Sequence, residues 1–388
     1  MKMELVPCNN ENLLANFPPI LRKNFSELFC RGKIGLSALT LNDISPTKQY
    51  TENDSTYSYY YTLKIPYAGK RLSWELIFDP EDMTFAPDFN FNDDSFYMSN
   101  DLELVSENLP SLANWNVNDP NALTTVLKEL LCLFKKQQLV KLQQDNIYAQ
   151  LYSEYQVLTI QISPSDVEIF LESGAAHFLI NIKVDISSLP EYLQPMKDNQ
   201  NDDLLNPGDD TCILKVSYVK LDGSKVNTSL QLSPRLDQVL GNMKTLHIPS
   251  YSKTTSLADY VNLVNKLLQD LVVRVEQHHK LKKEYIMTLA VMYSKNLIEF
   301  DSETFNRGEF LCEIDGYHCL VHIEIGELFP EEKPIVTLQS LYCIASKKIC
   351  TERINDYSYS PRWSPELMLR KLRTCLAEII PKFKMHKH

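Results

Sequence analysis

The chain has 388 residues, 44% of them hydrophobic and 23% charged, and its formal net charge at pH 7 is -11. This length suffices for two or three domains with cores of their own, and the acidic balance argues against a general nucleic-acid-binding protein, because such binding depends on Lys and Arg neutralising phosphates. The sequence has no apolar run near the roughly 20 residues of a membrane helix and no signal-peptide pattern at its start, so we expect neither membrane contact nor secretion.

The nine cysteines are odd in number and lack the regular spacing of a disulfide framework. Such usage is typical of free thiols in a reducing compartment. We therefore expect a protein of the cytoplasm and nucleus.

The first third predicts a helix followed by a four-stranded antiparallel meander. Apolar residues recur at helical spacing over 11–31, where a Pro-Pro pair interrupts or restarts the helix. Residues 57–65 and 71–78 alternate between two faces, as half-buried strands do. The four expected strands are 33–41, 57–65, 71–78 and 87–91.

An acidic loop, 92–108, precedes a stretch that contains Trp115. Asp119 is suited to cap a helix and Pro120 to occupy its first turn. The helix that follows continues to about residue 146 as a connector, and its apolar stripe is Leu123, Val126, Leu127, Leu130, Leu131 and Phe134.

The middle of the chain predicts a second set of strands and a long helix. The expected strands are 167–171, 177–186, 212–219 and 228–232, with a hairpin turn at Asp222-Gly223. The acid-rich stretch 198–210 lacks the ordered ligand spacing of a calcium loop, so we expect a solvated, mobile loop. A helix is predicted over 257–293, and its polar centre, with His278 and His279, is expected to be an exposed turn because adjacent residues point about 100° apart.

The last third repeats the pattern of the first. The expected strands are 297–300, 309–314, 317–325 and 335–342. Ser364 and Pro365 then open a second leucine-rich helix, as a cap and a first-turn residue do. Pro87 precedes Trp115 by 28 positions and Pro334 precedes Trp363 by 29. We therefore expect domains at 1–147, 148–280 and 281–388, the middle one being a candidate third copy.

This order of elements resembles the ubiquitin-conjugating-enzyme fold, and more closely its catalytically dead relatives, the ubiquitin-conjugating-enzyme variant (UEV) and RWD domains. The resemblance implies an α+β protein of tandem modules, each with a helix, a four-stranded antiparallel meander and a C-terminal helix. At finer grain the whole chain is similar to the UEV-containing scaffold subunits of BRISC-type deubiquitinase complexes. The motifs that carry this similarity, in order, are LKIPYAG at 63–69, LSPR at 232–235, LHIP at 246–249, KEYI at 283–286, FD at 300–301 and YSPRW at 359–363.

The finer resemblance implies a scaffold that carries no catalytic residue and no cofactor. In that family the subunit joins a deubiquitinase metalloprotease and its inactive partner to a von Willebrand A-like adaptor. The assembly cleaves lysine-sixty-three-linked ubiquitin chains, in the cytoplasm and in a nuclear DNA-damage counterpart. The residues that bind these partners are not assigned by the resemblance.

A conjugating enzyme would need an exposed thiolate between the last strand and the tryptophan, with an asparagine nearby for the oxyanion. The first copy has no cysteine over 92–114, since Cys30 and Cys132 lie elsewhere. The last copy has Cys343 and Cys350, but YCIA at 342–345 stands where His-Pro-Asn is expected. A lysine pair at 347–348 would lower the pKa of the Cys350 thiol, so a conjugating enzyme that uses Cys350 stays an alternative to the dead variant.

A metal site is a further candidate, because Cys312, His318, Cys319 and His322 have ligand-like spacing. Strand alternation places the two histidines on the face opposite Cys319, which argues against a tetrahedral site. The tryptophans, Trp74, Trp115 and Trp363, are expected to be packing residues. The sequence therefore favours a non-catalytic scaffold without metal or cofactor, with a ubiquitin-binding receptor as the second hypothesis.

Overall fold

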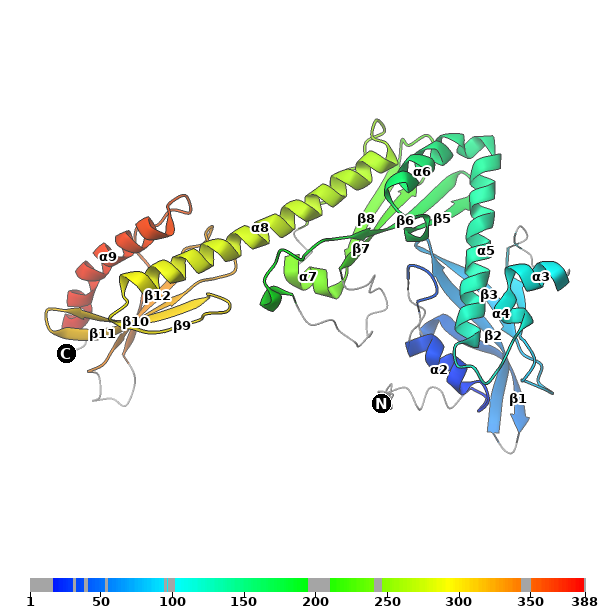
Figure 1. Cartoon of the computed structure of the whole chain (residues 1–388), viewed down its shortest axis with the longest axis horizontal. Helices are drawn as coiled ribbons and strands as arrows, with labels where there is room; N and C mark the ends of the chain where they lie inside the picture. Colours follow the sequence, from blue (N-terminus) through cyan, green and yellow to red (C-terminus); the bar gives the residue numbers. More distant parts are fainter. Residues whose placement is uncertain are drawn as a thin grey trace. The chain divides into compact units, whose positions relative to one another are not determined.

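The computed structural model describes residues 17–30, 33–37, 41–52, 55–93, 96, 102–194, 210–240, 246–342 and 350–386. It is an α+β structure with three separate antiparallel sheets, each with its strands in meander order (Figure 1). The chain divides into two compact units, one of Met1–Asp185 with Met196–Leu268 and the other of Ile186–Pro195 with Gln269–His388.

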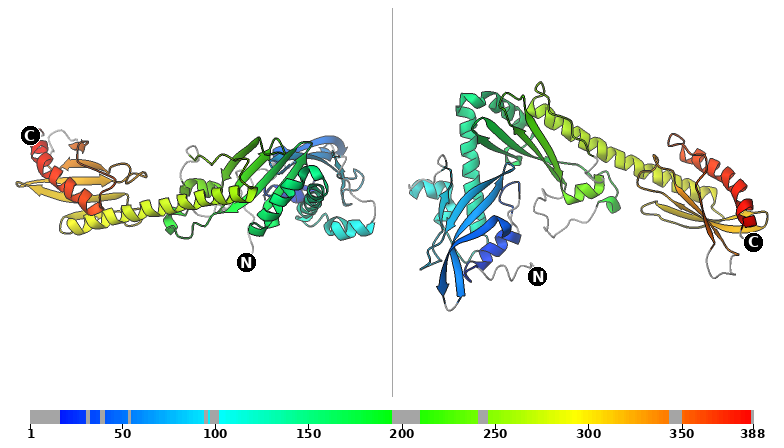
Figure 2. Two further views of the ribbon diagram at one scale, coloured as in Figure 1. Left: turned by 90° about the horizontal axis from the view of Figure 1, so that it is seen from above. Right: turned by 180° about the vertical axis from the view of Figure 1, so that it is seen from behind.

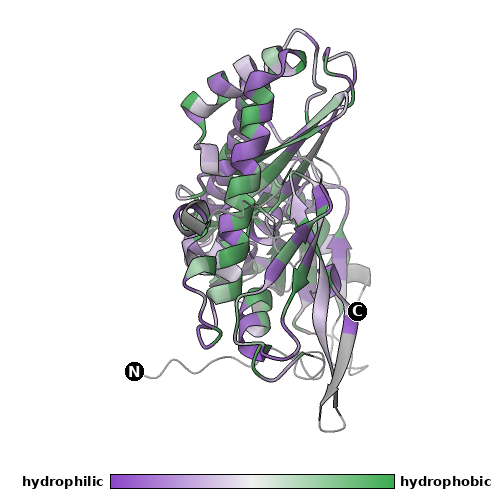
Figure 3. Cartoon of the chain, turned by 90° about the vertical axis from the view of Figure 1, so that its right-hand side faces the viewer, coloured by the Kyte–Doolittle hydropathy of each residue, from purple (hydrophilic) through white to green (hydrophobic). Residues whose placement is uncertain are grey.

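The first part of unit 1 is a sheet covered by helices. Its elements are α2 (Arg22–Cys30), the 3-10 turn η1 (Leu41–Asp43), β1 (Ile44–Glu52), β2 (Ser55–Tyr67), β3 (Lys70–Ile77), β4 (Asp88–Phe91), α3 (Leu102–Asn108), α4 (Pro110–Ala113) and α5 (Ala122–Gln144). The predicted alternation in β3 is confirmed, since Leu72, Trp74 and Leu76 are buried. All six residues of the predicted α5 stripe are buried as well, and Figure 3 shows hydrophobic and hydrophilic segments alternating along this helix.

Two predictions in this part are wrong. The strand expected at 33–41 is absent from the described residues there, and the first strand of the sheet is β1. Ile34 and Leu36 are buried in the core although the chain there is irregular. By contrast, β1 is a polar edge strand that is ordered by pairing with β2. The acidic stretch after β4 includes a helix, α3, instead of loop alone.

The start of α5 also differs from the prediction. Asn121 is the N-cap residue, without a side-chain capping bond. Asp119 instead accepts a hydrogen bond from the Asn121 N–H at 2.9 Å and forms a turn just before the helix.

The second part of unit 1 is a four-stranded sheet in the predicted strand positions. Its elements are η2 (Asn146–Tyr148), α6 (Ala149–Gln161), η3 (Pro164–Asp166), β5 (Val167–Glu172), β6 (Ala175–Lys183), β7 (Thr211–Tyr218), β8 (Val226–Leu232) and α7 (Pro234–Leu240). The turn at Asp222-Gly223 is confirmed, with Gly223 at φ 71°. The sequence did not predict α6 or α7. The acid-rich stretch lies outside the described residues except for Asp210, which pairs with Arg235 at 2.7 Å.

The long helix is confirmed as α8 (Leu257–Met292), one uninterrupted helix (Figure 2). Its first third, up to Leu268 and with buried Leu257, Tyr260 and Val264, belongs to unit 1. Its second half supplies Tyr285 and Leu289 to the core of unit 2.

Unit 2 contains a five-stranded sheet and a C-terminal helix. Its elements are η4 (Glu191–Leu193), the second half of α8, β9 (Leu297–Phe300), β10 (Arg307–Ile314), β11 (Tyr317–Glu324), β12 (Ile335–Ser340), β13 (Thr351–Ile354) and α9 (Pro365–His386). The edge strand β13 was not predicted, because four residues with three exposed side chains leave no hydrophobic pattern. The Ser364 cap is confirmed by a hydrogen bond from the Leu367 N–H to Ser364 Oγ at 3.4 Å.

The polar centre of α8 is not a freely exposed turn. His278 and His279 are half-buried, and the His279 ring lies 5.3 Å from Tyr192 and 5.7 Å from Phe305. The segment that carries Tyr192 therefore covers this turn of the helix within unit 2.

Among the described residues, no helix has the length and apolar character needed to cross a membrane.

Candidate functional site

The stretch before α5 is folded by its own side chains. Asn116 accepts a hydrogen bond from the Asn118 N–H at 3.0 Å, and the buried Asn24 of α2 donates to the carbonyl of Asp119 at 2.7 Å. Trp115 is half-buried against the core, with its ring 6.4 Å from that of Phe78. The stretch that leads into α5 is thus held by its own side chains and by α2, and the sequence has no cysteine over 92–114.

The corresponding stretch of unit 2 follows β12. Tyr342 stands where the oxyanion asparagine motif was expected, and its hydroxyl is hydrogen-bonded to His318 Nδ1 at 2.8 Å. Cys350 is disulfide-bonded and its carbonyl accepts from the Ser340 N–H at 2.9 Å. The expectation of a free thiol at Cys350 is therefore wrong, while Cys343 and the lysine pair at 347–348 lie outside the described residues. The cysteines described as free are Cys132, Cys212, Cys312, Cys319 and Cys375.

The four metal-ligand candidates divide between the two faces of the sheet as predicted. Cys312 of β10 and Cys319 of β11 are opposite each other in the strand register, and both contact the core. Burial raises the pKa of the Cys319 thiol to about 12. His322 lies on the other face, with Nδ1 3.0 Å from Glu309 and Nε2 3.1 Å from the Gln339 oxygen. The structure describes no group of three or more potential ligands in the part of the chain that it covers.

The hydrogen bonds of Glu309 predict that the stability of unit 2 depends on pH. Burial by itself raises the pKa of Glu309, but the hydrogen bonds from Arg307 and His322 outweigh it and hold the pKa below its usual value. A carboxylate with a lowered pKa stabilises the folded state above its unfolded-state pKa of about 4.3, and this contribution is lost as the pH falls through the folded value. Urea unfolding between pH 7 and 3 should show a steeper acid loss for the wild type than for Glu309→Gln, and equal slopes would contradict the assignment.

A buried carboxylate that the sequence did not indicate joins the two sheets of unit 1. Glu168 of β5 is 3% exposed. Its two oxygens accept hydrogen bonds from the Leu36 N–H at 2.7 Å and from the Ala68 N–H at 2.8 Å, both in the first part of the chain. Burial raises the pKa of Glu168, and the two N–H donors partly oppose this effect. One side chain thus fixes two loops of the first sheet to the edge strand of the second.

Two lysines complete the electrostatics of Glu168. Burial lowers the pKa of Lys33 and of Lys135, and the charge of Glu168 opposes that shift in both. Their positive charges in turn favour the ionised form of Glu168. The negative charge of the buried Glu168 is therefore balanced by the positive charges of two partly buried lysines. A buried carboxylate requires such partners.

Gly35 makes room for this carboxylate. A Cβ at this position would stand 2.5 Å from Glu168 Oε1 and 3.0 Å from Leu131 Cδ2. Gly35→Ala should lower the free energy of unfolding by about 1–3 kcal/mol, since overpacked sites shift their neighbours. Urea unfolding would measure this change, and the loss should shrink in a Glu168→Ala background; Gly326→Ala, where the nearest atom is 3.9 Å away, is the control with room for a methyl group.

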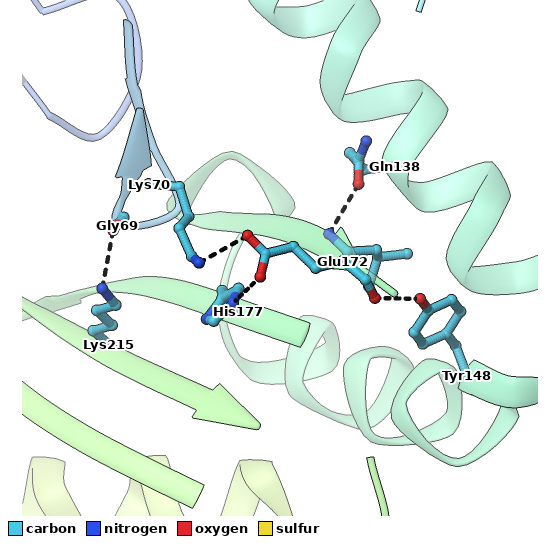
Figure 4. A network of polar contacts seen from close by, with 8 residues as sticks. Gly69, Lys70, Gln138, Tyr148, Glu172, His177 and Lys215 are labelled. Atoms are coloured by element: carbon cyan, nitrogen blue, oxygen red, sulfur yellow. Dashed lines mark hydrogen bonds and ion pairs between the residues drawn. The ribbon is translucent and has the colours of Figure 1, made fainter. Parts of the chain in front are cut away.

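Further polar contacts lie around Glu172, the last residue of β5 (Figure 4). Lys70 pairs with Glu172 at 2.7 Å, and Lys215 donates to the Gly69 carbonyl at 2.9 Å. Gln138 of α5 accepts a hydrogen bond from the Leu171 N–H at 3.0 Å. These contacts link the turn between β2 and β3 to β5 and β7, and they attach α5 to the second sheet.

The apolar core is continuous beneath this network. Leu179 and Ile213 of the second sheet belong to the same buried cluster as the first sheet and α5, and the Phe134 and Phe170 rings stack with centroids 6.3 Å apart. Polar and apolar contacts therefore make the two sheets of unit 1 one packed structure. Since both oxygens of Glu168 already accept backbone donors, the arrangement is suited to holding the chain together instead of acting on a substrate.

Three comparisons bear on the identity of the chain. A family model described as "Brain and reproductive organ-expressed protein (BRE)" matches residues 16–344. A Danio rerio protein named "BRISC and BRCA1-A complex member 2" is 29% identical over 384 residues, with 96% of each chain covered. A Branchiostoma floridae protein of the same name is 26% identical over 392 residues, with 97% of each chain covered. The predicted family resemblance is thus confirmed over nearly the whole sequence, and the chain belongs to the BRE family.

Proposed function

We propose that this protein is a non-catalytic scaffold subunit of a deubiquitinase complex. The observation that carries the proposal is the end-to-end similarity to relatives named as members of the BRISC and BRCA1-A complexes. A family name of this kind supports a subunit function, and similarity over 96% of both chains supports the same role for every part of this one.

The three sheets are proposed to be the cores of three UEV- or RWD-like modules, at 1–147, 148–280 and 281–388. Support comes from the recurring order of helix, antiparallel meander and helix around each sheet. In this reading α8 closes the middle module with its first half and opens the last module with its second half. Because the fold's catalytic constellation is missing from the first copy, the modules would act through their surfaces.

The proposed partners are those that the family resemblance implies. They are a metalloprotease subunit with its inactive partner and an adaptor with a von Willebrand A-like domain, in complexes that cleave lysine-sixty-three-linked chains in the cytoplasm and nucleus. The packed junction of unit 1 supports a scaffold, since a rigid body that spans two sheets can hold two partners at a fixed separation.

Affinity purification of the native protein, followed by cross-linking mass spectrometry, tests the proposal. The expected result is stoichiometric recovery of a metalloprotease pair and the adaptor, with cross-links that assign each module to one neighbour. Recovery of the chain only as a free monomer from native extracts would overturn the scaffold role.

The absence of catalysis is tested separately. Incubation with ubiquitin, ATP and an activating enzyme should give no reducible ubiquitin adduct on this chain. An adduct that disappears in Cys350→Ala would show a conjugating enzyme instead.

A further inference from the structure

The last helix has a charge opposite to that of the rest of the protein. Residues 351–388 hold eight Lys or Arg against four Asp or Glu, whereas residues 1–350 hold 31 against 46. The cations of α9 are Arg370, Lys371, Arg373, Lys382 and Lys384, and its acids are Glu366 and Glu378. The helix is therefore a local basic element on an acidic chain.

These cations border the exposed side of the helix. Its buried stripe, which packs on the sheet of unit 2, includes Met368, Leu372, Leu376, Ile380 and Phe383. At about 100° per residue, Arg370 and Arg373 lie along one edge of the exposed side, and Lys371 and Lys382 lie along the other. The strip between the two rows contains Leu367, which is 38% exposed, together with Thr374, Pro381 and the acidic Glu378.

Most of this charge is not neutralised within the protein. Arg370 pairs with Glu366 at 2.5 Å, but both side chains are more than half exposed, at 68% and 60%. Lys371, Arg373 and Lys382 are exposed and make no ion pair with any residue in the described part of the chain. Exposed pairs contribute little stability, so the basic rows are not explained by the packing of α9.

We propose that the outer face of α9 binds an acidic segment of a protein partner. Carboxylates of the segment would pair with the two rows of cations, and an apolar side chain would cover Leu367. Arg370 and Lys382 are twelve residues apart on the helix, a rise of about 18 Å, which an extended segment of about five or six residues matches at roughly 3.3 Å per residue.

A protein segment fits this face better than nucleic acid does. Salt confines electrostatic attraction to about 8 Å at physiological ionic strength, so a short acidic ligand experiences mainly the basic rows. A long polyanion would extend past α9 onto the rest of unit 2, where residues 269–350 hold 13 Asp or Glu against nine Lys or Arg. The inference goes beyond the proposed scaffold role, because it depends only on the charges and geometry of α9.

Fluorescence anisotropy on the purified full-length protein tests this binding. The probe is a labelled 12-residue peptide of Asp and Glu with two leucines, titrated at low and at physiological salt. Lys371→Glu with Arg373→Glu, one change in each row, should weaken binding at least tenfold, and the milder Lys371→Gln with Arg373→Gln should weaken it by less. The matched control is Lys136→Glu with Lys141→Glu, which reverses two exposed lysines of α5 and should change affinity less than twofold.

Three results would overturn the proposal. Wild-type protein that does not bind the peptide at low salt would exclude the site. An equal loss in the α5 control would show attraction without a specific face. Tighter binding of a 12-base-pair duplex, lost in the α9 variants, would assign the face to nucleic acid. None of these results depends on other subunits, so failure here leaves the scaffold proposal untouched.

Discussion

Glu168→Ala should lower the free energy of unfolding of unit 1 by about 3–5 kcal/mol, as the loss of one partner from a buried charged network does. The substitution leaves the N–H groups of Leu36 and Ala68 without their acceptor. It also removes one of the charges that oppose the desolvation of Lys33 and Lys135, while the charge of Asp166 remains. Buried donors that are left without partners are costly.

Urea unfolding followed by tryptophan fluorescence would measure this loss, with hydrogen exchange of β1 to β8 to locate it. Glu172→Ala is the matched control on the same strand. Its carboxylate is 40% exposed and pairs with Lys70 at the surface, so its removal should cost less than about 1 kcal/mol. If the two alanine variants lost the same stability, the hydrogen bonds of Glu168 would not be what holds the two sheets together.

Phe134→Ala should destabilise unit 1 by about 3–5 kcal/mol, the usual cost of deleting a buried phenylalanine. The side chain is fully buried on α5. Its ring lies 5.3 Å from Tyr67, 6.2 Å from Trp74 and 5.1 Å from Phe96 in the first sheet region, and 6.3 Å from Phe170 of the second sheet. A cavity at this point would therefore weaken the packing of both sheets together.

The same measurements would show whether the two sheets unfold as one structure. In Phe134→Ala, hydrogen exchange should accelerate in β1 to β4 and in β5 to β8 alike. Val140→Ala on the same helix is the control, because Val140 is 46% exposed and its truncation should change stability by no more than about 0.5 kcal/mol. Faster exchange in only one of the sheets would contradict a shared core.

Much of the fold was predictable from local patterns. Alternation placed β2 and β3, and the 3.6-residue stripe placed α5, α8 and α9. The hydrophobic pattern failed to predict the secondary structure where buried residues lie outside strands, or where a strand has few buried residues. Ile34 and Leu36 are buried from irregular chain, and β1 is a strand with few apolar residues. An edge strand is ordered by its neighbour's backbone, which leaves little trace in its own side chains.

Some features of the candidate site were likewise predictable from the sequence, and others were not. The order of residues was enough to identify the family, the missing thiol over 92–114 and the faces on which His318, His322 and Cys319 lie. The role of Glu168 became visible only in the folded chain, where this carboxylate of an ordinary strand binds backbone N–H groups 100 and 132 positions earlier. Periodicity in the sequence indicates which side of a helix or strand is buried. It does not indicate which distant segment packs against that side, because such contacts form only in the folded chain.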